Sequence, residues 1–172
     1  MGLDKVLFIP SYISPHKQNG NPAGPDDRKA MIKLAVENEP DFEIEDYEID
    51  KRGVSYSIDT VRYLKNKYKD DKLYWIIGAD MLFNIEKWHE YRQLLNEMEF
   101  ISVVRNGFDA DKCSAYIDDL CKKYAARIIL CRMKRIGISS SMIRDMVKRG
   151  KCIKKFVHKK VGKYIIDNNL YK

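Results

Sequence analysis

The sequence predicts an α/β protein in which helices flank a parallel β-sheet. Two observations indicate this fold class. Short apolar runs that are typical of strands alternate with longer segments whose apolar residues recur at helical spacing. Polar residues or glycines follow directly after the apolar runs, as expected where parallel strands end and pass into crossover helices. The length of 172 residues suits one core, so we expect residues 1–172 to form a single domain.

The first predicted elements are a strand, a long loop, a helix and a second strand. Residues 6–9 form an apolar run that predicts a buried strand. A loop rich in Pro and Gly follows over residues 11–25, and loops of this length in compact domains are often functional. Asp26 or Asp27 then caps a helix. Apolar and acidic residues alternate over residues 42–49 with one slip, which predicts a half-exposed strand.

Strands and helices alternate through the rest of the chain. Continuous apolar runs predict further strands over residues 73–78, 100–104 and 128–131. Helical spacing of apolar residues predicts helices over residues 58–68, 79–86, 90–98, 111–125 and 157–168. One more helix is expected to begin inside the serine run 139–141, because Ser is a strong N-cap residue.

Composition excludes several classes of protein. The formal net charge is +7, and the excess of Lys and Arg gathers near the C-terminus. Such a stretch is more typical of a solvated helix face, or of a field that attracts a small polyanion, than of nucleic-acid binding, since no aromatic residues interleave with the charges. The four cysteines lack metal-site and redox spacing and are expected to be reduced thiols. No apolar run could span a membrane and no secretory signal is visible, so we expect a cytoplasmic protein without a membrane partner.

Four segments are candidates for a ligand site. In open parallel sheets, ligands bind at the carboxyl ends of the strands, which selects residues 11–17, 78–80, 105–107 and 137–144. The last segment reads Gly-Ile-Ser-Ser-Ser-Met-Ile-Arg. It combines the N-terminus of a helix with hydroxyl donors and a guanidinium, which together suit a triphosphate. An ordinary serine cap fits the same residues.

Several short motifs occur in one order along nearly the whole chain. They are Phe8-Ile9-Pro10 with Pro15-His16-Lys17, Arg28-x-x-Met31, Ser55-Tyr56-Ser57-Ile58-Asp59-Thr60, Gly78-Ala79-Asp80 with Trp88, Val103-Val104-Arg105-x-Gly107, and Ile138-Ser139-Ser140-Ser141-x-x-Arg144. Through this ordered set the chain resembles bacterial nicotinate-mononucleotide adenylyltransferases of the nucleotidyltransferase superfamily. The resemblance implies a Rossmann-like sheet of the nucleotidyltransferase type. It also implies transfer of the adenylyl group of ATP to nicotinate mononucleotide, which gives nicotinate adenine dinucleotide and pyrophosphate in NAD synthesis. Mg²⁺ would arrive with ATP.

The resemblance implies roles for individual residues. ATP would contact Gly78, Asp80, Arg105, Ser139, Ser140, Ser141 and Arg144, and of these Ser139, Ser141 and Arg144 would act in catalysis. Nicotinate mononucleotide would contact His16, Lys17, Ser57, Asp80, Trp88 and His89. Trp88 would stack on the nicotinate ring, although a core tryptophan fits that position equally well without the resemblance.

One part of the family pattern has no counterpart in the printed sequence. It is the first strand, a G-x-F-D-P-x-H-x-G-H loop and a helix, whose paired histidines contact the ATP phosphates. We therefore expect the domain to be incomplete at its N-terminus and the 172-residue chain alone to be poorly active. The absent strand would lie beside the runs at residues 6–9 and 73–78, and its loss would leave their ladders unpaired.

Two alternative functions stay open. The first is adenylyl transfer to phosphopantetheine or to another mononucleotide, because such enzymes share the serine-rich segment that resembles residues 139–144. Residues 55–60 and Trp88 favour the pyridine nucleotide as substrate. The second is a non-catalytic protein that binds a nucleotide, or binds nucleic acid through its basic C-terminal region.

Overall fold

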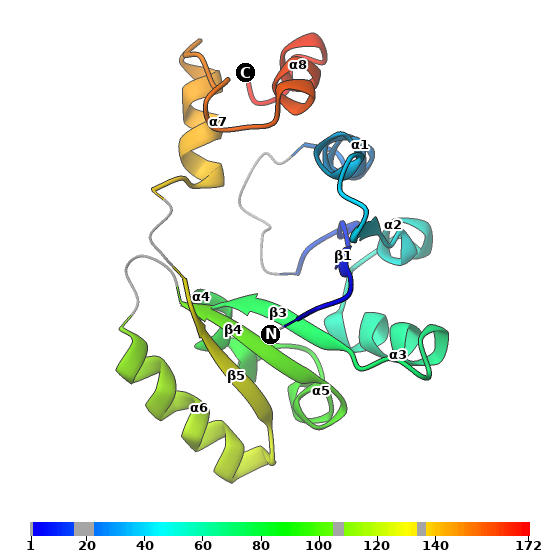
Figure 1. Cartoon of the computed structure of the whole chain (residues 1–172), viewed down its shortest axis with the longest axis vertical. Coiled ribbons are helices and arrows are strands. Elements are labelled where there is room, and N and C mark those ends of the chain that lie inside the picture. Colours follow the sequence, from blue (N-terminus) through cyan, green and yellow to red (C-terminus); the bar gives the residue numbers. More distant parts are fainter. Residues whose placement is uncertain (1, 16–22, 105–108, 134–136) are drawn as a thin grey trace. The chain divides into compact units, whose positions relative to one another are not determined.

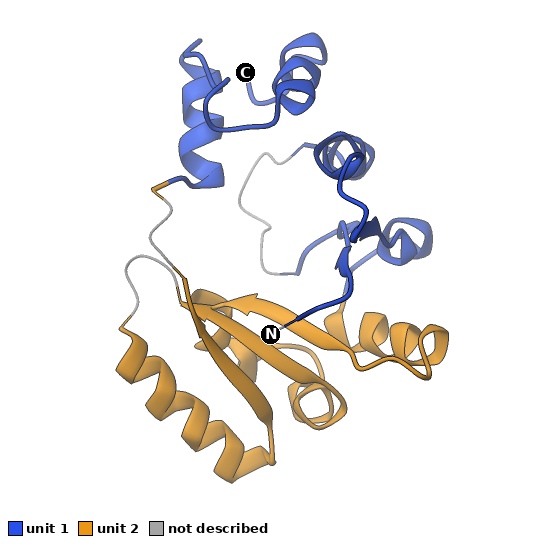
Figure 2. Ribbon diagram, viewed as in Figure 1, with its two compact units in different colours: residues 1–55, 138–172 blue, residues 56–137 orange. Residues whose placement is uncertain are grey.

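Two compact units make up the computed structural model, which describes residues 2–15, 23–104, 109–133 and 137–172 (Figure 1). Residues 1–55 and 138–172 form one unit, called here the terminal unit, and residues 56–137 form the central unit (Figure 2). Each unit contains a parallel sheet of its own, so the predicted α/β class is confirmed. A single domain over residues 1–172 stays a prediction.

The terminal unit is built on a two-stranded parallel sheet. Strand β1 (Val6–Phe8) pairs with β2 (Phe42–Ile44). Its helices are α1 (Pro25–Val36), α2 (Tyr47–Lys51), α7 (Ser140–Lys148) and α8 (Lys159–Asp167). Helices α1 and α8 pack side by side, and the hydroxyl of Tyr164 donates a hydrogen bond to Asp27 at 2.9 Å. An ion pair joins Lys160 of α8 to Glu37, the C-cap of α1.

The central unit holds a three-stranded parallel sheet in the order β3-β4-β5. Its strands are β3 (Tyr74–Gly78), β4 (Glu99–Val104) and β5 (Arg127–Arg132). The helices between and before them are α3 (Ser57–Lys67), α4 (Ala79–Leu82), the 3₁₀ helix η1 (Ile85–Lys87), α5 (Tyr91–Glu97) and α6 (Ala110–Tyr124).

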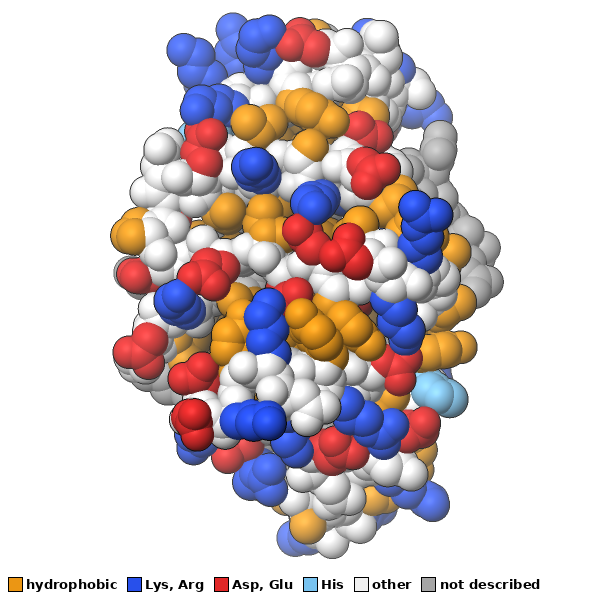
Figure 3. All heavy atoms as spheres, turned by 90° about the vertical axis from the view of Figure 1, so that its right-hand side faces the viewer, with side chains coloured by type: hydrophobic (Ala, Val, Ile, Leu, Met, Phe, Trp, Pro, Cys, Tyr) orange, Lys and Arg blue, Asp and Glu red, His pale blue; other side chains and the backbone are white. Residues whose placement is uncertain are grey.

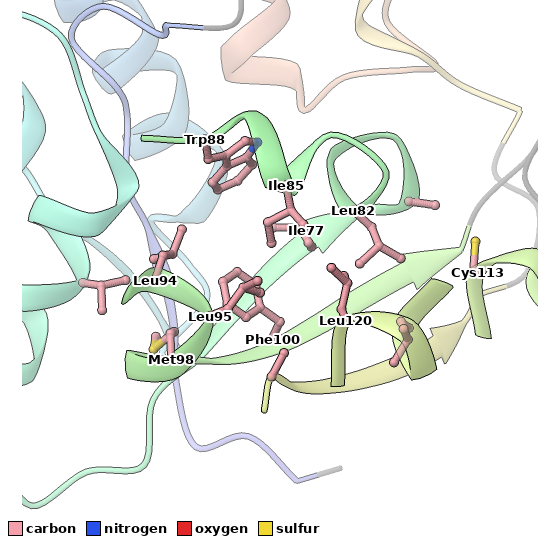
Figure 4. Packing of buried hydrophobic residues seen from close by; sticks show 14 of the residues in the cluster. Ile77, Leu82, Ile85, Trp88, Leu94, Leu95, Met98, Phe100, Cys113 and Leu120 are labelled. Atoms are coloured by element: carbon pink, nitrogen blue, oxygen red, sulfur yellow. The ribbon is translucent and has the colours of Figure 1, made fainter. Parts of the chain in front are cut away.

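The core of the central unit lies on one face of this sheet. Fully buried side chains include Leu82 of α4, Leu94 of α5, Phe100 of β4 and Leu120 of α6 (Figure 4). Burying each such side chain contributes about 1.5–3 kcal/mol to folding. The core therefore fixes the helices of this unit against one face of the sheet.

The opposite face of the same sheet carries a row of isoleucines. Ile76, Ile101 and Ile129 are direct neighbours across β3, β4 and β5. Ile76 is 50% exposed and Ile129 is 39% exposed, whereas Ile101 in the central strand is 5% exposed. Because side chains alternate between faces along a strand, Ile77 points to the buried face and is only 5% exposed.

Most predicted elements are confirmed, but the segment 42–49 is predicted wrongly. The strand stops at Ile44, and α2 begins at Tyr47. The last ladder bond runs from the N–H of Glu45 to the carbonyl of Phe8 at 3.0 Å. The slip in the alternation thus marks the end of the strand, because a helix cannot keep the period of a strand.

The cap of the first helix also differs from the prediction. Helix α1 has Gly24 as its N-cap and Pro25 in its first turn, in place of a cap at Asp26 or Asp27. Proline is preorganised for the first helical position because its φ is fixed near the helical value, so the helix begins earlier than the carboxylates suggest.

Residues 79–86 form a short helix and a 3₁₀ turn where one helix was predicted. The side-chain amide of Asn84 donates to the carbonyl of Asp80 at 2.8 Å, and the backbone N–H of Asn84 donates to the carbonyl of Met81 at 3.1 Å. The side chain takes the acceptor that the next helical bond would use, so α4 ends.

The first and third strands are less buried than predicted. All three residues of β1 are half-buried, and β3 has Ile77 as its one fully buried residue. Within the described residues each of these strands has a single ladder partner, β2 for β1 and β4 for β3. A strand at the edge of a sheet is covered on fewer sides.

Candidate functional site

The serine run starts a helix as predicted. Ser139 is the N-cap of α7, and its hydroxyl accepts a hydrogen bond from the backbone N–H of Met142 at 3.1 Å. A hydroxyl that accepts in this way keeps its own proton to donate outward. Ser140 and Ser141 follow in the first turn, and all three serines are exposed.

Arg144 completes this helix start. Its guanidinium donates to the hydroxyl of Ser141 at 3.2 Å, and both side chains are exposed. The first turn of α7 carries no acidic residue. The structure therefore brings two hydroxyl groups, a guanidinium and the positive end of a helix dipole together on one accessible surface of the terminal unit.

A second arginine organises the loop after β1. The guanidinium of Arg28 donates to the hydroxyl of Ser11 at 3.1 Å, to the carbonyl of Tyr12 at 3.0 Å and to the carbonyl of Ala23 at 3.1 Å. One side chain on α1 thus holds both described ends of the loop. His16 and Lys17, which were predicted to contact substrate, fall outside the described residues.

The same loop is tied to the start of the motif at residues 55–60. The N–H of Tyr12 donates to the hydroxyl of Ser55 at 2.9 Å, and the N–H of Ser55 donates to the carbonyl of Ile13 at 2.9 Å. Ser55 is buried, and these two hydrogen bonds satisfy its hydroxyl and its backbone N–H.

Three predicted residues of the central unit lie at the starts of helices. Ser57 is the first residue of α3. Gly78 ends β3 and is the N-cap of α4, and Asp80 lies in the first turn of that helix. Gly78 and Asp80 therefore sit at the carboxyl end of β3, where the fold class places ligands. Arg105, which follows β4, is outside the described residues.

Trp88 lies in the hydrophobic core. It is 8% exposed and packs in the same cluster as Ile85 and Leu94, on the border of the group seen in Figure 4. The side chain thus fills the role of a core tryptophan. Stacking of its ring on nicotinate stays a prediction.

The residue after the buried Trp88, His89, presents an exposed aromatic side chain. The imidazole of His89 is 51% exposed, and its ring lies 4.3 Å from that of Tyr56 at an interplanar angle of 35°. This contact brings the predicted residues Ser57 and His89 to one place, since Tyr56 immediately precedes Ser57. Tyr56 was not predicted as a site residue, because no local spacing reveals a contact between distant residues.

The predicted residues divide between the two units. Ser139, Ser140, Ser141 and Arg144 belong to the terminal unit, whereas Ser57, Gly78, Asp80, Trp88 and His89 belong to the central unit. A shallow cavity of about 200 Å³ in the central unit lies elsewhere, at the amino ends of the strands, and its lining includes Leu73, Glu99 and Arg127. None of the predicted site residues lines it.

Other features of the described residues bear on what the protein can bind. No helix among them is long and apolar enough to cross a membrane. Groups of three or more His, Cys, Asp or Glu side chains suited to a metal ion are absent from the described part of the chain. All four cysteines are free thiols, and burial raises the pKa of the Cys113 thiol. On the surface seen in Figure 3, basic and acidic side chains are interspersed.

Comparison with known proteins places this arrangement in a class. The fold is that of a nucleotidyltransferase, and the family model described as cytidylyltransferase-like matches residues 1–146. A probable nicotinate-nucleotide adenylyltransferase of Caldicellulosiruptor saccharolyticus is 38% identical over 170 residues, which cover 99% of this chain and 85% of that protein. The nicotinate-nucleotide adenylyltransferase of Bacillus subtilis is 37% identical over 170 residues, with 99% and 84% covered.

A solved structure agrees in fold. Nicotinic acid mononucleotide adenylyltransferase of Plasmodium falciparum, complexed with NaAD, superposes with a TM-score of 0.77 at 21% identity, covering 98% of this chain and 83% of that one. At that identity the likeness concerns the fold alone. With the relatives above, the chain belongs to the nicotinate-nucleotide adenylyltransferase family, within the cytidylyltransferase-like proteins.

Proposed function

We propose that this chain transfers the adenylyl group of ATP to nicotinate mononucleotide, with nicotinate adenine dinucleotide and pyrophosphate as products. One observation carries the proposal. Relatives described as nicotinate-nucleotide adenylyltransferases are 37–38% identical to this chain over 99% of its length.

The reaction needs positioning and charge neutralisation more than covalent help from the protein. The phosphate of nicotinate mononucleotide attacks the α-phosphorus of ATP, and the bond from that phosphorus to the bridging oxygen of pyrophosphate breaks. Ser139 and Ser141 would donate to triphosphate oxygens, and Arg144 would offset the charge that develops on the leaving pyrophosphate. Ser140 and Arg105 would add donors to the same phosphates. Mg²⁺ would reach the site as part of the substrate, MgATP.

The central unit would hold the pyridine nucleotide. Ser57 opens α3, so its hydroxyl and the positive helix end suit the nicotinate carboxylate. Asp80, at the carboxyl end of β3, suits ribose hydroxyls as an acceptor, with Gly78 allowing close approach. Trp88 and His89 would border the nicotinate ring, and His16 and Lys17 would contribute from the loop after β1.

Direct titration tests the proposal without depending on the rate of the reaction. The 172-residue chain is titrated calorimetrically with nicotinate mononucleotide, MgATP, phosphopantetheine and an oligonucleotide. We expect the first two ligands to bind and the last two to give no heat. Binding of phosphopantetheine but not nicotinate mononucleotide would reverse the substrate assignment. Tight, steeply salt-dependent binding of the oligonucleotide without binding of either mononucleotide would contradict the enzyme assignment and favour a non-catalytic nucleic-acid-binding protein.

A pyrophosphate-release assay adds the chemical step. The assay compares the 172 printed residues, which contain no H-x-G-H pair, with a longer fusion that carries one. Fusion of the family's strand-loop-helix segment before Met1 should raise the rate, and the same fusion with both histidines changed to alanine is the matched control. Equal rates for these two fusions would contradict the proposed role of the histidine pair.

A further inference from the structure

A carboxylate just before Trp88 is held by two phenols. Glu86 lies in η1 and accepts hydrogen bonds from the hydroxyl of Tyr116 at 2.8 Å and from that of Tyr124 at 2.7 Å. The two tyrosines stand about two turns apart on α6, so they lie on one face of that helix. Each carboxylate oxygen has its own donor, and this arrangement fixes the orientation of the whole group.

Further contacts hold the two phenols themselves. The rings of Tyr91 and Tyr124 meet edge to face at 5.5 Å, and their hydroxyl oxygens lie 3.4 Å apart. The ring of Tyr116 lies 5.2 Å from that of Phe83. The cluster therefore joins η1 to α5 and α6 within the central unit.

The charges around Glu86 agree with this geometry. Hydrogen bonds from Tyr124 and Tyr116 hold the pKa of Glu86 below its ordinary value, and Lys123 acts in the same direction against the opposing charge of Asp119. Burial and the neighbouring carboxylate raise the pKa of Tyr116, so its hydroxyl stays protonated as a donor.

The segment is also held at its other end. Glu90 has a positive φ of 49° and accepts a hydrogen bond from the guanidinium of Arg62 on α3 at 2.8 Å. Trp88 and His89 lie between these two anchors. The backbone N–H of Trp88 donates to the carbonyl of Ile85 at 3.0 Å. The two residues are thus fixed from α6 on one side and from α3 on the other.

We propose that Glu86, Tyr116 and Tyr124 are positioning residues that set the Trp88–His89 segment for binding of nicotinate mononucleotide. The inference rests on the proposed function. These three side chains act on the ligand through η1. Their loss should therefore weaken the binding of nicotinate mononucleotide and leave the binding of ATP unchanged. Glu86 itself is only half-buried, and a carboxylate in that position could be solvated without two protein donors.

The test compares tyrosine-to-phenylalanine variants that delete one hydroxyl and keep the ring. Tyr116→Phe, Tyr124→Phe and the double variant are titrated with nicotinate mononucleotide and with MgATP, as full 172-residue chains. The double variant should bind nicotinate mononucleotide about three- to tenfold more weakly, since two hydrogen bonds to a charged group are lost. Its affinity for MgATP should stay within about twofold. Tyr68→Phe, in the C-cap of α3, is the matched control and should change neither affinity.

A ligand-free measurement reads the segment directly. Trp75 and Trp88 are the two tryptophans of the chain, so Trp75→Phe leaves Trp88 as the sole indole emitter. In that background the double variant should show stronger acrylamide quenching of Trp88, and Glu86→Gln, which keeps the side-chain shape, should show the same trend.

The outcomes separate the inference from the function beneath it. A parent chain that binds no nicotinate mononucleotide overturns the proposed function and this inference together. A parent that binds it, beside a double variant that binds equally well with unchanged quenching, overturns the inference alone. Equal weakening of both ligands with a lower unfolding midpoint also overturns it, because that result marks a general structural role.

Discussion

At the scale of single residues, arginine is the organising side chain of the terminal unit. Arg28 serves three acceptors from two separated stretches of chain, and Arg144 carries the charge of the serine helix start. The guanidinium suits both tasks, because it offers five donors in a rigid planar fork and stays charged at any working pH.

Replacement of Arg28 should show how much the loop after β1 depends on it. Arg28→Lys keeps the charge but cannot serve Ser11, Tyr12 and Ala23 together, so we expect a loss of about 1–3 kcal/mol in the free energy of unfolding. Urea denaturation followed by circular dichroism measures it. Arg149→Lys is the control, since Arg149, the C-cap of α7, forms an exposed pair with Asp145. Equal midpoints for both variants would show that Arg28 does not hold the loop.

The predictability of these residues from sequence follows the range of their contacts. The N-cap at Ser139 depends on the N–H of Met142 and was correctly placed from a local pattern. The three acceptors of Arg28 and the ring contact between Tyr56 and His89 join distant parts of the chain. No periodicity reports such contacts, so the sequence alone could not predict them.

At the scale of elements, short-range competition decides where helices begin and end. Pro25 starts α1 before the carboxylates that were expected to cap it, and Asn84 stops α4 by taking the carbonyl of Asp80. Apolar spacing predicted the presence of these helices, whereas their ends depended on single hydrogen bonds that spacing does not describe.

The anchoring of η1 predicts a pH dependence of stability. The pKa of Glu86 is lower in the folded chain than its ordinary value of 4.5, because of Tyr124 first and Tyr116 next. The stabilisation is therefore complete above pH 4.5 and is lost as pH falls through the folded pKa.

Denaturant unfolding at pH 7 and pH 3 checks this dependence. The parent should be more stable than the Tyr116→Phe, Tyr124→Phe double variant at neutral pH. The gap in unfolding free energy should narrow below the ordinary pKa of 4.5, because the Glu86 carboxyl then gains a proton in the unfolded chain before it does in the folded one. The difference between the two chains isolates Glu86 from other carboxylates that titrate in both. A gap that stays constant across this range would contradict the assignment.

At the scale of the whole molecule, all pairs in both sheets are parallel, and the central sheet is covered by its own helices on one face. The apolar runs and their order predicted this architecture. The low burial of β1 and β3 was not predicted, because it depends on how many neighbours a strand has and not on its own apolar content.

Two neighbouring isoleucines on β3 test which face carries the core. Ile77→Ala should lower the free energy of unfolding by about 2–5 kcal/mol, since a buried branched side chain leaves a cavity. Ile76→Ala removes the same atoms from a half-exposed position and should cost about 1 kcal/mol or less. Chemical denaturation compares the two. A larger effect at Ile76 would reverse the assignment of the faces.

The two-substrate account is tested most directly by calorimetric titration of Arg144→Ala and Ser57→Ala, each against MgATP and nicotinate mononucleotide. Arg144→Ala removes a charged donor to phosphate. It should lower the affinity for MgATP by about tenfold or more and leave the affinity for nicotinate mononucleotide unchanged. Ser57→Ala should do the reverse, with the larger loss for nicotinate mononucleotide. If both variants weakened the same ligand, or neither ligand bound the parent chain, the account would be contradicted.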